Sequence, residues 1–172
     1  MAWHEIVKYS PHKYDSNGVY TADEWTSRSD VGKHYDGKLF TLEEYLRVEQ
    51  QYIDVILSVM KITNCKYMTI HYIEADKEYI VSQIISSKFH KIDVPLLKSV
   101  PLLEEKRRIH IKKISDILRL CLREYAYVVL YNKEHKLQIE FGYDYYLKIS
   151  SSLNYETLKK VVNKEGLYLD PR

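Results

Sequence analysis

Cysteine is scarce in this sequence: of its 172 residues only Cys65 and Cys121 are cysteines, and both lie inside apolar patterns. Neither has a neighbouring cysteine or histidine at the spacing of metal ligands. Small secreted domains usually rely on a set of disulfides, which two isolated thiols do not provide. We therefore interpret both thiols as buried small hydrophobic residues in a reducing compartment.

Long hydrophobic runs are also absent. No stretch approaches the roughly 20 apolar residues that a transmembrane helix requires. The opening Met1–Glu5 lacks the basic and then apolar segments of a secretory signal. We therefore expect a cytosolic (cytoplasmic) protein with no membrane partner.

Neither sign of charge dominates, because 26 basic and 24 acidic residues give a net charge of +2. A domain that binds nucleic acid usually carries a basic excess, since its affinity comes mainly from phosphate neutralisation. The strongest basic cluster, Lys106–Lys113, could contact phosphate or RNA, and nucleic-acid binding through it is an alternative function. Glu104 and Glu105 adjoin the cluster, however, and its interleaved isoleucines fit the solvated side of a packed helix. We therefore expect no nucleic-acid partner.

Recognisable catalytic motifs are missing as well. The five glycines form no phosphate-binding loop, and no two of the seven histidines have the i, i+4 spacing of a zinc helix. His34 with Asp30 and Asp36 could form a general base with an orienting carboxylate, but loop clusters of this kind are common by chance. We expect no catalytic residues, no cofactor and no metal, and a small enzyme is the weakest alternative.

The length favours one domain over residues 1–172. The clearest helix runs from Thr41 to about Asn64, where Thr41 and Glu44 form a capping box and apolar residues recur at helical spacing. Glu49 falls on the same apolar stripe, either at its edge or paired with a buried partner, and we favour the edge. A second long helix is predicted over 107–125, with Arg123 on its solvated side.

Strands dominate the last third of the chain. Three are predicted there, at Ala126–Tyr131, Leu137–Phe141 and Tyr143–Ile149, and a fourth strand is predicted earlier, at Tyr67–Ile73. Residues 77–89 favour a helix over a strand, 90–105 form a connection, and 154–164 form a last helix. The predicted fold class is α+β: a single domain whose antiparallel (or mixed) sheet has a C-terminal three-stranded meander packed against the two long helices.

Tyrosine is the one residue type in excess, with 17 copies. Tyrosine is enriched at protein interfaces, although an AT-rich gene would also raise the count. Residues 1–40 are irregular, polar and aromatic, and we expect them to wrap the surface with aromatic anchors. In the predicted strand 143–149, Tyr143 and Tyr145 share one face, while Asp144 and Tyr146 project from the other. With Glu140 nearby, this side forms either an aromatic and acidic patch for a basic partner or an ordinary amphipathic strand.

Several segments resemble a known family: Asp23–Lys33, Thr41–Leu46, Leu120–Glu124, Glu140–Tyr146 and the closing Glu165–Leu169. Together they are similar to immunity proteins of contact-dependent growth inhibition and related polymorphic toxin systems. In particular, they resemble the immunity proteins that neutralise EndoU-type RNase toxins. The resemblance implies a cytosolic antitoxin that binds one cognate toxin domain, in a 1:1 complex, and blocks its active site or RNA path.

The candidate contact residues come from this sequence alone. An RNase groove is basic, so an inhibitor needs acidic and aromatic groups to fill it. Two groups could supply them: Asp23, Glu24, Trp25 and Asp30, or Glu140, Asp144 and Tyr146. We expect Trp25 or Tyr146 to be a buried anchor of the complex.

Overall fold

The computed structural model describes residues 2–170, and its longest element is helix α1 (Leu42–Ile62). The Thr41 hydroxyl caps the first turn by accepting a hydrogen bond from the Glu44 amide at 3.2 Å. The Glu44 carboxylate pairs with Arg47, in place of the reciprocal bond of the predicted capping box. The apolar stripe of the helix is buried, as its helical spacing predicts.

Seven strands form one sheet in the order β5-β4-β6-β7-β8-β1-β9, and all neighbours described are antiparallel. The predicted α+β class and the C-terminal meander, β6-β7-β8, are therefore confirmed. The strands are β1 (Trp3–Val7), β4 (Tyr67–Glu74), β5 (Arg108–His110), β6 (Tyr127–Asn132), β7 (Leu137–Phe141), β8 (Leu147–Ser150) and β9 (Tyr168–Leu169).

The shorter helices connect and cover the sheet. The helix predicted over residues 77–89 is present as α2, and α5 ends before Gly166, whose φ of +79° suits a glycine after a helix. The remaining elements include α2 (Lys77–Ser86), α3 (His90–Asp93), the 3-10 segment η3 (Val94–Leu102), α4 (Ile111–Leu122) and α5 (Tyr155–Lys164).

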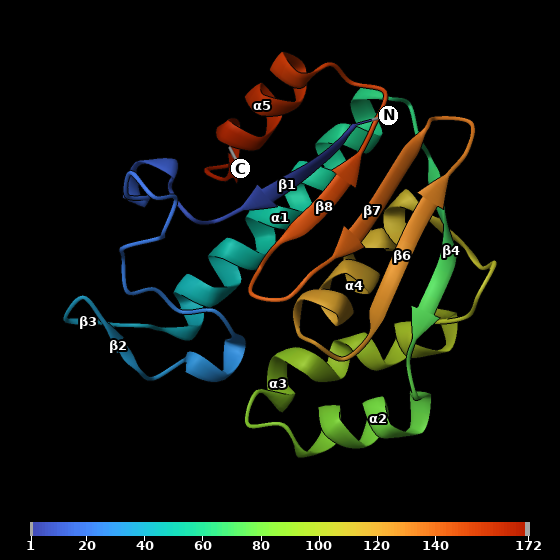
Figure 1. Cartoon of the computed structure of the whole chain (residues 1–172). Coiled ribbons are helices and arrows are strands. Elements are labelled where there is room, and N and C mark those ends of the chain that lie inside the picture. Colours follow the sequence, from blue (N-terminus) through green and yellow to red (C-terminus); the bar gives the residue numbers. More distant parts are fainter. Residues whose placement is uncertain (1, 171–172) are drawn as a thin grey trace.

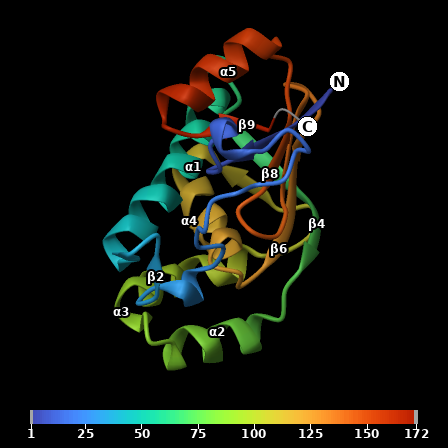
Figure 2. The ribbon, with the colours of Figure 1, turned by 60° about the vertical axis from the view of Figure 1, so that its left-hand side comes forward.

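The helices lie on one side of the sheet. Figure 1 shows α1 and α4 behind the strands, and Figure 2, turned by 60°, again places them on one side only. Leu130, Ile139 and Ile149 lie opposite one another in the register and are fully buried, so they mark the core face of the sheet. No helix of residues 2–170 covers the other face (Figure 2).

The N-terminal segment is less irregular than its sequence predicts. β1 pairs with β8 and β9, and its Ile6 lies opposite Leu147 and Leu169. The rest of the segment contains two short 3-10 turns, η1 (Pro11–Lys13) and η2 (Arg28–Asp30), and the hairpin β2 (His34–Tyr35) with β3 (Lys38–Leu39). The sequence does not predict β1, because both of its partner strands lie at the far end of the chain.

The second long helix begins later than predicted. α4 starts at Ile111, and Arg108–His110 form the edge strand β5 beside β4. Ile109 lies opposite Met68 and is 2% exposed, so burial of this side chain, together with backbone pairing to β4, holds the segment in the sheet. The basic cluster 106–113 is therefore divided between an edge strand and the first turn of a helix, and does not form one solvated helix face.

Two charged residues contradict the sequence-based predictions. Glu49 is 2% exposed and Arg123 is 6% exposed, so neither lies at an edge or in solvent. Their side chains form a bidentate ion pair, with Nε–Oε1 and Nη2–Oε2 distances of 2.7 Å. Burial alone disfavours the charged guanidinium, but the hydrogen bond and charge of Glu49 outweigh it, so the pKa of Arg123 is raised.

The ion pair continues into a larger buried network. Arg123 Nη1 donates to Asp93 Oδ1 at 2.8 Å, and Asp93 is fully buried. Asp93 also accepts hydrogen bonds from Arg28 at 2.6 Å and from the Tyr125 hydroxyl at 2.6 Å. Because Arg28 belongs to η2, the network joins the N-terminal segment to α1, α3 and the end of α4.

Replacing Arg123 with methionine removes the bidentate partner of buried Glu49 and one of the two arginine partners of buried Asp93, which keeps Arg28. We expect the free energy of unfolding, measured by urea denaturation, to fall by about 3–5 kcal/mol. Arg47→Met is the control, because the Arg47–Glu44 pair is largely exposed and its loss costs about 1 kcal/mol or less. Equal effects of the two substitutions would contradict the structural role of Arg123.

Candidate functional site

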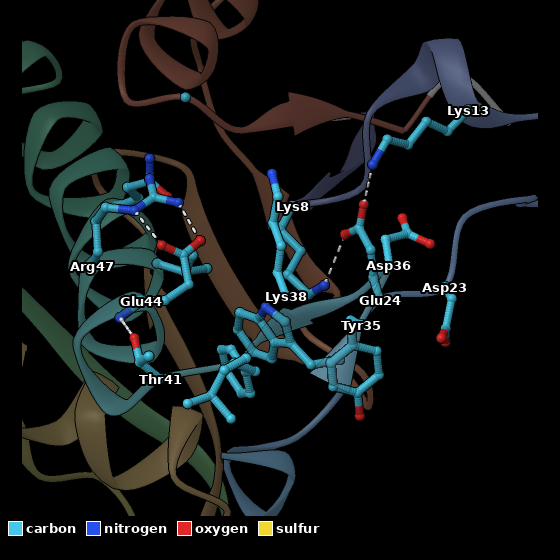
Figure 3. A pocket seen from close by; sticks show the side chains of 16 residues that line it. Lys8, Lys13, Asp23, Glu24, Tyr35, Asp36, Lys38, Thr41, Glu44 and Arg47 are labelled. Atoms are coloured by element: carbon cyan, nitrogen blue, oxygen red, sulfur yellow. Dashed lines mark hydrogen bonds and ion pairs between the residues drawn. The ribbon is translucent and has the colours of Figure 1, made fainter. Parts of the chain in front are cut away.

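One cavity, the N-terminal pocket, lies between the N-terminal segment and α1 and has a volume of about 610 Å³. Asp23, Glu24 and Trp25, three of the predicted contact residues, line it. Figure 3 shows charged side chains of both signs around it, among them Lys8, Lys13, Asp36, Lys38, Glu44 and Arg47.

Several charges of this pocket are already paired within the chain. Glu24 binds Lys13 at 2.7 Å and Lys8 at 3.2 Å, and Glu44 binds Arg47 at 2.6 Å (Figure 3). Burial raises the pKa of Glu24, but its hydrogen bonds to the lysines and to Tyr20 outweigh this, so its pKa is lowered. The pocket therefore offers a basic partner little uncompensated negative charge at Glu24.

Trp25 and Asp30 have structural positions. Trp25 is 7% exposed, stacks on Phe40 with ring centroids 4.4 Å apart, and meets Tyr145 edge-on at 5.0 Å. Asp30 is 7% exposed and accepts hydrogen bonds from the amides of residues 26 and 27 and from Lys33, which orders η2. This geometry does not favour Trp25 as a surface anchor, nor Asp30 as the orienting carboxylate of a histidine base.

The predicted strand 143–149 begins only at residue 147, because residues 142–146 form the turn between β7 and β8. Asp144 and Tyr145 have φ angles of +54° and +63°, the left-handed pair of a type I′ hairpin turn. Tyr143 and Tyr145 therefore do not share a face, which corrects the prediction. Tyr143 is 94% exposed at the turn, whereas Tyr145 is 6% exposed.

Buried contacts hold this unusual turn in place. The Tyr145 ring packs against Tyr52 and Trp25, and its hydroxyl donates to the Leu122 carbonyl at 3.3 Å. The Tyr52 hydroxyl donates to the Tyr145 carbonyl at 2.6 Å, and the Tyr9 hydroxyl to the Asp144 carbonyl at 2.7 Å. These contacts offset the strain of two non-glycine residues with positive φ, and they present Tyr143 to solvent.

The uncovered side of the strands, the open sheet face, is rich in tyrosine. The register and the alternation of side chains place on it residues that lie opposite the buried rows. They are Trp3, Glu5, Tyr67, Thr69, Tyr72, Glu74, Arg108, His110, Tyr127, Val129, Tyr131, Gln138, Glu140, Lys148 and Ser150.

A groove of about 560 Å³ lies on this face beside the exposed turn. We call it the acidic groove, because three carboxylates and one lysine supply its charge. Its polar and aromatic lining consists of Tyr72, Glu74, Glu124, Tyr127, Glu140, Tyr143 and Lys148. Of the seven predicted contact residues, the acidic groove contains Glu140, and Asp144 adjoins it in the turn.

The carboxylates of the acidic groove have no ionic partner in the described part of the chain. No lysine, arginine or histidine nitrogen of residues 2–170 lies within 4.0 Å of Glu74, Glu124 or Glu140. Two are instead oriented by tyrosines, with hydrogen bonds of 2.7 Å from Tyr72 to Glu74 and 2.8 Å from Tyr127 to Glu140. Burial and the bond to Glu140 raise the pKa of Tyr127, so its hydroxyl stays a donor at neutral pH.

A second groove, of about 570 Å³, adjoins the first across the strands. Trp3, Glu5 and Asp170 line it, and it shares Glu140 and Lys148 with the acidic groove. We call it the flanking groove. Sequence reasoning missed Glu5 and Lys148, because only the strand register brings β1 beside β8 and β7.

The described residues contain no group of three or more histidine, cysteine or acidic side chains that could hold a metal. Among the same residues, none of the helices combines the length and the hydrophobicity needed to cross a membrane.

The acidic groove is suited to binding cations and aromatic or apolar groups at once.

Comparison with protein-family models, with curated proteins and with solved structures finds no match to this chain. The resemblance to immunity proteins therefore stays a prediction, and the argument for function depends on the geometry.

The two tryptophans provide a test of the structural role of Trp25. We expect Trp25→Ala to lower the free energy of unfolding by about 3–5 kcal/mol, because it leaves a cavity in the core. Trp3→Ala, at a position that is 45% exposed, should cost about 1 kcal/mol or less. Urea denaturation of both variants measures the difference. Similar small losses of unfolding free energy in both variants would contradict the burial of Trp25 in the core and would favour a surface contact.

Cys121 lines the floor of the acidic groove and is 6% exposed. Burial raises the pKa of its thiol to about 12. Because alkylation requires the thiolate and pH 8 lies far below this pKa, we expect iodoacetamide not to modify Cys121 in the folded protein. Mass spectrometry of the native and urea-unfolded protein tests this, and rapid native labelling would contradict the burial of the groove floor.

Proposed function

We propose that this protein is a cytosolic immunity protein that binds a basic toxin domain, a nuclease, through the acidic groove. The observation that supports it best is the group of three carboxylates that line the acidic groove without an ionic partner among residues 2–170, beside an uncovered, tyrosine-rich sheet face. By contrast, the carboxylates Glu24 and Glu44 of the N-terminal pocket have cationic partners within the chain. Among the described residues, the acidic groove therefore offers a partner three carboxylates whose charge is uncompensated.

The physical chemistry of RNA cleavage fits such a partner. An enzyme that binds RNA neutralises phosphates with lysine and arginine, so its substrate path is basic. Carboxylates that face this path would speed association and select the partner, while tyrosines would supply packed contact area. Tyr143, 94% exposed, and Tyr72, 43% exposed, are suited to insert into such a path.

The proposal changes the set of contact residues. Glu140 remains central and Asp144 is retained at the rim, while Tyr143 replaces Tyr146 as the proposed anchor because Tyr146 is only partly exposed. Trp25 and Asp30 are assigned to the fold.

A genetic experiment tests the function directly. This protein is co-expressed with the C-terminal domain of the protein encoded immediately upstream. We expect the cells to survive the otherwise toxic domain, and the two proteins to co-purify as a 1:1 complex. A harmless neighbour, or a toxic one that neither binds nor is neutralised, would overturn the proposal.

The groove variants locate the interface within that complex. We expect Glu74→Gln with Glu140→Gln to weaken binding at least tenfold, because two carboxylates lose their charge while keeping their shape. Tyr143→Ala should weaken it by a similar or larger factor. Isothermal titration calorimetry at 150 mM salt provides the affinities.

Matched controls lie on other surfaces. Glu43→Gln removes an exposed charge from α1, and Tyr79→Ala removes an aromatic ring that is 62% exposed on α2. Neither should change the affinity more than about twofold, since both lie outside the acidic groove. Equal effects of groove and control variants would show that the partner binds elsewhere.

Nucleic-acid binding has one specific observation in its favour. On the edge strand β5 the Arg108 guanidinium lies 3.5 Å from the centroid of the Tyr67 ring, on the same open sheet face. Stacked rings beside cations are suited to single-stranded RNA. Binding of an oligonucleotide that weakens steeply with salt, and that Arg108→Ala abolishes, would support this alternative.

A further inference from the structure

A row of alternating charge crosses three strands of the open sheet face. Glu5 on β1 lies opposite Lys148 on β8, and Lys148 lies opposite Glu140 on β7. Neighbouring strands are about 4.8 Å apart, so the two outer carboxylates are separated by about 10 Å at the backbone. The order of charge across the row is negative, positive, negative.

In the described residues, the three charged side chains of this row form no ion pairs with one another. Among residues 2–170, no carboxylate oxygen lies within 4.0 Å of the Lys148 ammonium group. Lys148 lines both the acidic groove and the flanking groove, and it lies between the two. It is also the only lysine or arginine that lines either groove in the described structure.

We infer that Lys148 determines specificity by receiving a carboxylate of the partner, while Glu5 and Glu140 receive cations on either side of it. The inference depends on the proposed function and defines the partner surface further. That surface presents an acidic side chain between two basic ones, across about 10 Å. A partner with a third cation at the centre is rejected, because like charges in a desolvated interface repel.

The alternative interpretation predicts the opposite change in affinity when the charge of Lys148 is reversed. If the partner surface is basic throughout, Lys148 only weakens the attraction, and reversing its charge strengthens the complex. If the partner places a carboxylate there, the same reversal sets two negative charges against each other. The direction of the change in affinity therefore decides between the readings.

The experiment measures Lys148→Glu and Lys148→Met against the toxin domain encoded upstream, by isothermal titration calorimetry. We expect Lys148→Met to weaken binding about tenfold and Lys148→Glu at least a hundredfold. Lys61→Glu on α1 makes the same change in net charge at an exposed position, and should alter the affinity about twofold or less. Urea denaturation of each variant verifies that the fold is retained.

A rescue identifies the partner residue. Acidic residues of the toxin domain are replaced with lysine one at a time, and one of them should restore binding to Lys148→Glu while weakening binding to the unchanged protein. Unchanged or tighter binding by Lys148→Glu overturns this inference but leaves the proposed function standing. No binding by the unchanged protein overturns the proposed function itself.

Discussion

The buried guanidinium of Arg123 is the interaction on which the arrangement of the helices depends. It binds Glu49 of α1 and Asp93 of α3 from the end of α4, and Arg28 of η2 also reaches Asp93. A buried charge requires all its partners in place, so this one group fixes four segments on the same side of the sheet. The other side stays uncovered, and the candidate site lies there.

Local patterns predict the elements of this fold well, whereas long-range pairing decides the details that they miss. The helical spacing after Thr41 and the C-terminal three-stranded meander are properties of short segments, and both are confirmed, although the last strand begins four residues later than predicted. The burial of Glu49 depends on Arg123, 74 residues later. The position of Glu49 on an apolar stripe allows a buried partner but does not identify it, and Arg123 by itself fits the solvated side of its helix. The positive φ angles of Asp144 and Tyr145 escape prediction from the sequence for a similar reason, because their turn is stabilised by distant aromatic residues.

The candidate site follows the same division. Of the aromatic and acidic group that the sequence indicates around Glu140, the structure places Glu140 itself in the acidic groove, while Tyr72, Glu74 and Tyr127 come from strands β4 and β6. The sequence cannot indicate that Trp25 belongs to the core, nor that Glu5 lies beside Lys148. Both facts depend on β1 and the N-terminal segment folding back onto strands from the end of the chain.

The distribution of charge reconciles a net charge of +2 with the proposed binding of a basic partner. Exposed charges act over about 8 Å at physiological ionic strength, so a partner senses the local surface and not the sum over the chain. Glu24, Glu44 and Glu49 have cationic partners within the fold, whereas in the part of the chain that the structure describes the side chains of Glu74 and Glu140 are hydrogen-bonded only to tyrosines. A tyrosine hydroxyl orients a carboxylate but leaves its charge in place. The open sheet face therefore keeps negative charge that the basic side chains of a second protein can neutralise once that protein excludes water from the grooves.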